Sequence, residues 1–158
     1  MITIRVQEPA FDVGAELTAL RRISAEIGAI TSFTGLVRDI NDDDAVSSLF
    51  LEHYPGMTEK QIGLIVAEAS QRWQVIGVTV IHRVGLLTPG DEIVFVAVAS
   101  RHRGDAFDAA EFIMDYLKTR ATFWKKEQTQ EGDRWLTTRE SDVEAAAEWQ
   151  LPDGQVDL

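Results

Sequence analysis

The chain has 158 residues, 45% of them hydrophobic, and this size and composition predict one globular domain with its own core. Its formal net charge of −11 argues against a nucleic-acid-binding protein, because such proteins usually carry a basic face. It contains no cysteine, which excludes disulfides, thiolate catalysis and cysteine-ligated metal centres.

The N-terminal segment predicts a strand over residues 2–6, because apolar and polar residues alternate there. It lacks the basic start and long apolar stretch of a signal peptide. No run in the chain approaches the ~18 apolar residues needed to span a bilayer. We therefore expect a soluble cytoplasmic protein that does not associate with membranes.

The next elements are a short helix, a strand and a loop. Asp12 is placed to cap a helix whose apolar face begins at Val13. Residues 28–37, rich in Ile, Thr, Phe and Val, predict a strand that ends before Arg38. The acidic run 41–44 predicts an exposed loop rather than a metal site, because the ligand spacing of a calcium loop is absent.

A strand over residues 46–54 is ended by the Pro-Gly pair at 55–56. Thr58 and Gln61 form a capping-box pattern for a following helix. The apolar face of this helix is predicted to be Ile62, Ile65, Ala69 and Trp73.

Residues 75–82 alternate as a strand does, residues 88–91 predict a turn, and the apolar run 93–99 predicts a central strand covered on both faces. Asp105 is expected to cap a helix. Its predicted apolar face, interpreted as core, is Phe107, Ala110, Ile113, Met114 and Leu117.

The C-terminal part predicts a β-hairpin formed by residues 123–128 and 134–138. Ser141, with Glu144, is expected to cap a last helix over residues 143–149. We therefore predict one α+β domain over residues 1–150, with a mixed sheet and an added hairpin. Residues 151–158 are expected to form a flexible tail.

Lysine is scarce in this chain, yet three of its four lysines, Lys118, Lys125 and Lys126, lie close together in the sequence. This positive island in an acidic protein suits a phosphate, a carboxylate or a developing anion. The alternative is a helix end, where Lys118 and Arg120 would favour the negative pole of the helix. In a strand, Lys125 and Lys126 point to opposite faces and cannot both enter one pocket.

A second basic cluster, Arg101–Arg103, precedes the helix predicted near Asp105. Because a helix N-terminus is partially positive, a bound anion would relieve the conflict. The alternative is a solvated turn neutralised by nearby aspartates. Arg38, at a strand end, is a weak signal by itself. His53 and His82 fit packed histidines, and no metal-site spacing is present.

Several ordered strings between residues 28 and 149 resemble the large, catalytic subunit of molybdopterin synthase. The matching strings are residues 33–38, 51–60, 81–85, 89–94, 101–103, 112–121, 123–127 and 132–135. Leu36 and Thr122 depart from the family pattern, in which Lys and Pro occur at these positions.

The resemblance implies an α/β hammerhead-type fold and a homodimer within a heterotetramer. The partner implied is a small ubiquitin-like sulfur-carrier subunit that ends in a Gly-Gly thiocarboxylate. The reaction implied is sulfur transfer from that thiocarboxylate to cyclic pyranopterin monophosphate, which builds the dithiolene of molybdopterin. No cofactor, metal or nucleic acid is implied.

The resemblance also assigns site residues. Lys118 and Lys125 match the catalytic pair, and Arg139 matches an arginine that reaches the pocket from the other protomer. The substrate-binding positions implied are Leu36, Val37, Arg38, His102, Arg103, Lys118, Lys125, Lys126, Glu127 and Arg139. Two other functions fit the basic clusters: a non-catalytic module that binds a phosphorylated metabolite, and a scaffold that docks a ubiquitin-like tail.

Overall fold

The computed structural model describes residues 1–42 and 44–150, and its largest feature is a mixed four-stranded sheet. The strand order is β1 (Ile2–Gln7), β5 (Gly77–Arg83), β7 (Glu92–Ser100) and β2 (Ala29–Leu36). β1 and β5 are parallel, and the other pairs are antiparallel. The predicted α+β class with a mixed sheet is confirmed.

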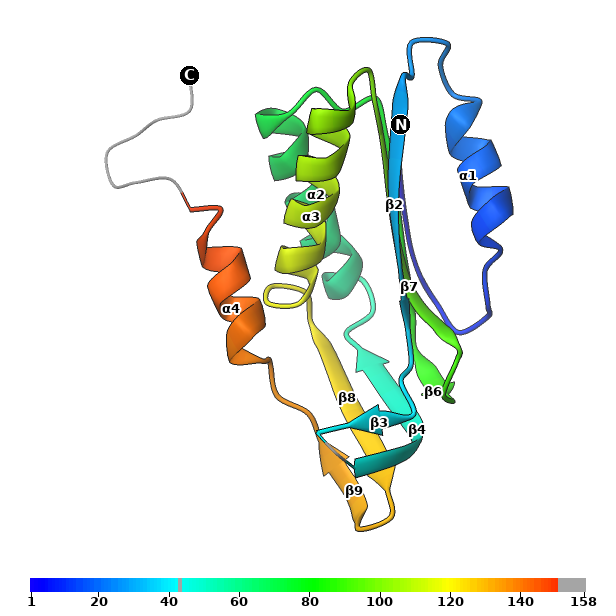
Figure 1. Cartoon of the computed structure of the whole chain (residues 1–158), viewed down its shortest axis with the longest axis vertical. Coiled ribbons are helices and arrows are strands. Elements are labelled where there is room, and N and C mark those ends of the chain that lie inside the picture. The colour runs from blue at the N-terminus through cyan, green and yellow to red at the C-terminus, as the bar shows by residue number, and fades with distance from the viewer. Residues whose placement is uncertain (43, 151–158) are drawn as a thin grey trace.

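A second, smaller sheet lies below the first in Figure 1 and carries part of the site. It contains β3 (Ile40–Asn41), β4 (Asp44–His53), β8 (Phe123–Thr129) and β9 (Gly132–Trp135) in that order. β6 (Gly85–Leu87), which the sequence did not predict, also pairs with β4. The β8–β9 pair confirms that a hairpin forms here, although its second strand lies at Gly132–Trp135 rather than over residues 134–138.

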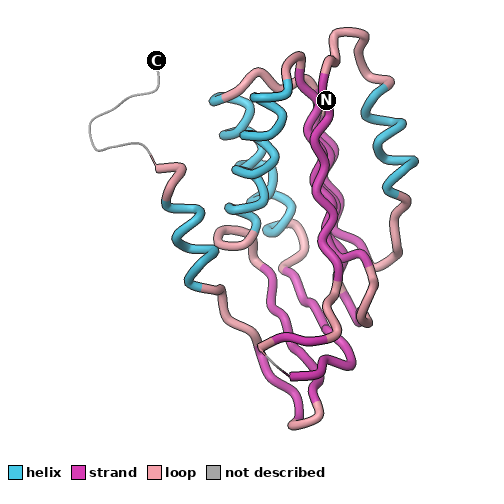
Figure 2. The backbone as a smooth tube through the Cα atoms, viewed as in Figure 1, coloured by secondary structure: helices cyan, strands magenta, loops and turns pink. Residues whose placement is uncertain are grey.

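Helices cover both faces of the large sheet (Figures 1 and 2). α1 (Val13–Arg21) contacts one face, whereas α2 (Met57–Arg72) and α3 (Arg103–Leu117) contact the other. α4 (Glu140–Ala147) packs against α3. Because β7 is an inner strand covered on both sides, eight consecutive residues from Ile93 are buried, which confirms the predicted central strand.

Three helix starts differ from the predictions, although the Asp12 cap of α1 is confirmed by its bond from the Ala15 N–H (2.9 Å). α2 is capped by the backbone of Gly56, whose N–H donates to Glu59 (2.6 Å). Thr58 is buried instead, and its hydroxyl donates to the carbonyl of Thr122 (2.9 Å). The predicted capping box at Thr58 is therefore wrong, because the hydroxyl of Thr58 bonds to a residue outside the helix.

α3 begins at Arg103, two residues before the predicted cap at Asp105. The Asp105 carboxylate instead accepts the backbone N–H of Gln74 (3.2 Å). Phe107, predicted as core, is 59% exposed, because the small residues Ala106 and Ala110 of the same turns face inward. The prediction of Phe107 as core is wrong.

The segment that leads into β4 also differs from its prediction as an exposed loop. Asn41 pairs with β4 as part of β3 and is only 6% exposed.

α4 begins at Glu140 rather than after a Ser141 cap. The predicted tail over residues 151–158, and residue 43 of the acidic run, lie outside the described residues. No helix in the described part of the chain has the length and apolar character needed to cross a membrane.

Candidate active site between the two sheets

Two of the clustered lysines converge on one site where the sheets meet. Lys118 is the C-terminal cap residue of α3, and Lys125 lies on β8. Two adjoining cavities are both lined by Lys118, Lys125 and Arg139. The lysines therefore stand at the boundary between two spaces.

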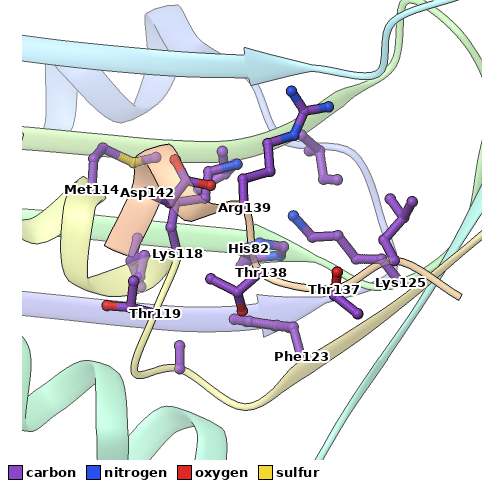
Figure 3. A pocket seen from close by; sticks show the side chains of 15 residues that line it. His82, Met114, Lys118, Thr119, Phe123, Lys125, Thr137, Thr138, Arg139 and Asp142 are labelled. Atoms are coloured by element: carbon purple, nitrogen blue, oxygen red, sulfur yellow. The ribbon is translucent and has the colours of Figure 1, made fainter. Parts of the chain in front are cut away.

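The first cavity lies between β8, the end of α3 and the start of α4 (Figure 3). Its volume is about 160 Å³. Besides the shared residues, its polar and aromatic lining consists of His82, Thr119, Phe123, Thr137, Thr138 and Asp142. Phe123 and Lys125 share this side of β8, as the strand alternation predicted.

The second cavity is a more open groove of about 440 Å³ along the end of β2. Leu36, Val37, Arg38 and Glu127 line it together with the shared residues. Its charged lining consists of four cationic side chains and one carboxylate, in a protein whose net charge is −11. Such a groove favours an anionic ligand.

The electrostatics of Lys125 follow from its position. Burial lowers the pKa of its ammonium from 10.5 to about 8, and repulsion from Lys118 acts in the same direction. Asp142 on α4 opposes the shift. A lysine with a pKa near 8 can both stabilise an anion and exchange a proton near neutral pH.

His82 lies beside these lysines on β5 and is neutral at physiological pH. Burial lowers the pKa of its imidazole from 6.5 to about 3. Its ring stacks on Phe123 with 3.9 Å between the ring centroids. Nδ1 lies 2.8 Å from the carbonyl of Arg83 and must carry the proton, because a carbonyl only accepts. His82 is thus packed, as predicted, but it also lines the first cavity.

A hydrogen-bonded network forms one wall of the groove, in which Asn41 and Glu127 are buried while Arg38 and Arg139 are exposed. Arg38 donates to the Oδ1 atom of Asn41 (3.0 Å), and Arg139 donates to the same oxygen. The amide nitrogen of Asn41 donates to Glu127. The other oxygen of Glu127 accepts from Arg134 Nε (3.1 Å) and Nη2 (3.0 Å). Arg38, Arg139 and Glu127, all assigned by resemblance, are therefore joined through Asn41.

Lys126 lies on the opposite side of β8 from Lys125. Its ammonium is 3.6 Å from the Asp133 carboxylate and 5.7 Å from the ring centroid of Trp135. Lys126 lines neither cavity. The prediction that the two adjacent lysines cannot share a pocket is confirmed, and a substrate contact by Lys126 stays a prediction.

His102 and Arg103 lie at the other end of α3 from Lys118. The helix has 15 residues, so its two ends are about 22 Å apart. One chain therefore does not bring these residues to the lysine site. By contrast, Arg139 lies in the cavity of the same chain as Lys125, whereas the resemblance implied that it comes from a second protomer.

The sequence did not predict three features of the site. These are the presence of Asn41, the presence of Asp142, and the contact of His82 with the first cavity. Asn41 sits in an acidic run that resembles a loop, and Asp142 looks like an ordinary acidic residue of a first helical turn. Only the folded chain brings them next to Lys125 and Arg139. No signal in the local sequence distinguishes them.

Comparison with known proteins identifies the family of this chain. The family model described as MoaE protein matches residues 6–120. A Ralstonia nicotianae protein named molybdopterin synthase catalytic subunit is 62% identical over 149 residues, covering 94% of this chain and 85% of that protein.

Two solved structures share the fold. The molybdopterin biosynthesis MoaE protein from Burkholderia ambifaria is 52% identical with a TM-score of 0.83, over 96% of this chain and 100% of that chain. Molybdopterin synthase from Staphylococcus aureus is 30% identical with a TM-score of 0.77, over 84% of this chain and 95% of that chain. On this evidence, the chain belongs to the MoaE protein family.

Proposed function

We propose that this chain is the catalytic subunit of a molybdopterin synthase. It transfers sulfur from the C-terminal thiocarboxylate of a small ubiquitin-like partner to cyclic pyranopterin monophosphate. The observation that carries the proposal is the position of Lys118 and Lys125 at the boundary of two adjoining cavities. A transfer between two separate molecules needs such a meeting point.

The chemistry of the two cavities suggests which reactant occupies each. The groove holds Arg38 and Arg139, whose guanidinium groups suit the phosphate of the pterin substrate. The first cavity is narrower and is lined by Phe123, His82 and threonine hydroxyls, which suits an extended peptide tail. The thiocarboxylate would then reach the lysines from one side and the substrate from the other.

In the proposed reaction, the thiocarboxylate sulfur attacks an oxygen-bearing side-chain carbon of the pterin. A C–S bond replaces the C–O bond, the displaced oxygen leaves as water, and a thioester joins partner and substrate. Water then cleaves the thioester, leaving sulfur on the substrate and a carboxylate on the partner. A second thiocarboxylated partner supplies the second sulfur as the cyclic phosphate opens. Lys118 stabilises the negative charge at the partner's C-terminus, and Lys125 transfers a proton or holds the substrate.

A homodimer completes the proposal. Because His102 and Arg103 lie about 22 Å from Lys118 along α3, they can contact this substrate only from a second copy of the chain. The assembly we propose is a heterotetramer of two such chains and two small partners. We place it in the cytoplasm, which cell fractionation can test.

The test is reconstitution with a thiocarboxylated partner and cyclic pyranopterin monophosphate, followed by quantification of molybdopterin. Lys118→Ala should lower turnover by about 100- to 1000-fold, the usual effect of removing one charge-assisted donor from a transition state. Lys60→Ala, which removes an exposed lysine of α2 that lines neither cavity, is the matched control.

Full turnover by Lys118→Ala would remove that lysine from the mechanism. If wild-type protein binds the partner yet forms no product, the chain is a scaffold. If it binds only the pterin phosphate, it is a binding module.

A further inference from the structure

We propose that Asn41 is a positioning residue of this reaction, which holds the two arginines of the groove in the geometry that binds the substrate's anionic end. This inference rests on the proposed function. Asn41 is the only asparagine in the chain and lies outside every residue that the family resemblance assigned to the site. It lines the groove together with Arg38 and Arg139.

The hydrogen bonds of Asn41 occupy both lone pairs of its amide oxygen and one of the two N–H groups of its amide nitrogen. Oδ1 accepts from Arg38 (3.0 Å) and from Arg139, which uses both lone pairs of that oxygen. Nδ2 donates to the buried carboxylate of Glu127. The main-chain carbonyl of Asn41 accepts from Arg134 (3.0 Å), so the backbone is anchored as well.

The charge of this arrangement explains why an amide suits the position. Two guanidinium groups meet at one neutral oxygen, so their positive charge stays available to a ligand. An aspartate would neutralise part of that charge and would place a second carboxylate against Glu127. The next residue, Asp42, carries a charge and is exposed, whereas the buried position is occupied by the uncharged Asn41.

The carboxylate on the other side of Asn41 is already neutralised. Glu127 forms two bonds with Arg134, 3.1 and 3.0 Å long. Glu127 therefore fixes the orientation of the amide, since its oxygen can only accept and so selects the NH₂ group. With the amide turned this way, Oδ1 must face the arginines. Arg38 and Arg139 come from different elements, and this oxygen is their common contact.

The experiment is a double-mutant cycle on the full-length protein, reconstituted with the thiocarboxylated partner. Steady-state kinetics and direct titration with cyclic pyranopterin monophosphate are measured for Asn41→Ala, Arg38→Ala and the double variant. We expect Asn41→Ala to raise the substrate's KM and Kd about tenfold or more, with a smaller change in kcat and none in partner binding.

In the Arg38→Ala background, the same change at Asn41 should have at most a third of that effect, because one of its two partners is gone. A purely structural role would give independent, multiplicative effects. Ser48→Ala is the matched control, because Ser48 is as buried as Asn41 (both 6% exposed) on the same sheet and bonds Gln128 instead (2.6 Å).

The outcomes separate this inference from the proposed function. No product from the wild-type protein contradicts the proposed function. Normal wild-type turnover, with unchanged KM and Kd in Asn41→Ala or with fully multiplicative effects in the cycle, overturns the role of Asn41. If thermal melting shows that Asn41→Ala is unfolded, the cycle is run with Asn41→Ser, whose shorter side chain places its oxygen farther from both arginines.

Discussion

Replacing Lys125 with methionine should stabilise the protein at neutral pH and abolish most of its activity. The ammonium is largely removed from water, and burial lowers its pKa from 10.5 to about 8. Each pKa unit corresponds to about 1.4 kcal/mol, so the charged lysine costs the folded state about 3 kcal/mol. Methionine has a similar length and no charge, so it removes this cost.

The pH dependence of this cost has a definite sign. Below pH 8 Lys125 is protonated in both states, and the full cost is present. Between pH 8 and 10.5 the folded protein releases the proton first, so the unfolded chain binds more protons and stability rises with pH. The advantage of Lys125→Met should therefore fall to roughly half its neutral value by pH 9.5.

Urea denaturation at pH 7 and pH 9.5 measures both effects. Lys126→Met, on the opposite face of β8, is the matched control for loss of a neighbouring lysine. The reasoning is refuted if Lys125→Met is no more stable than wild type at pH 7, or if its advantage does not shrink at pH 9.5.

The pH dependence of activity in wild type and in Lys125→Arg distinguishes a need for positive charge at residue 125 from proton transfer by Lys125. If the ammonium form of Lys125 is required, wild-type kcat/KM falls as pH rises through about 8. Lys125→Arg should remove this decline, because a guanidinium stays protonated. A decline that persists in Lys125→Arg belongs to another group.

Two further predictions concern His82 and Arg103. His82 is neutral in the folded protein, with a pKa of about 3 against 6.5 when unfolded, so stability is lost as pH falls below 6.5. His82→Gln should reduce this loss by about 2–3 kcal/mol at pH 4.5, as measured by urea denaturation; an equal loss in both proteins would contradict it. Arg103→Ala should chiefly raise the substrate's KM, whereas Arg101→Ala, which removes the ion pair with Glu26 (2.7 Å), should not. An unchanged KM would remove Arg103 from the site.

Local sequence patterns gave correct predictions where the structure depends on the residues of one strand or one helix end. The apolar run 93–99 identified the inner strand, because only a strand covered on both faces buries every residue. The alternation around Lys125 placed it and Lys126 on opposite faces, because successive residues of a strand point in opposite directions. The Asp12 cap is equally local, since donor and acceptor lie three residues apart.

Local sequence patterns gave wrong predictions where a side chain's bonding or packing depends on a segment far away in the sequence. Thr58 has the chemistry of a helix cap, but its hydroxyl bonds Thr122, which is 64 residues away in the sequence. Phe107 has the periodicity of a core residue, but the alanines on its helix allow closer packing against the sheet and leave the ring outside. In both cases the tertiary contact outweighs the local preference.

The sequence by itself determined the α+β class, most of the strands, and the scarcity and clustering of lysine, because these depend on residue order and composition. Only the tertiary structure decided that Lys118 and Lys125 share two cavities and that Asn41 joins Arg38 to Arg139. It also placed His102 and Arg103 at the far end of α3. A site depends on distances between segments that are far apart in the chain, and no local pattern records those distances.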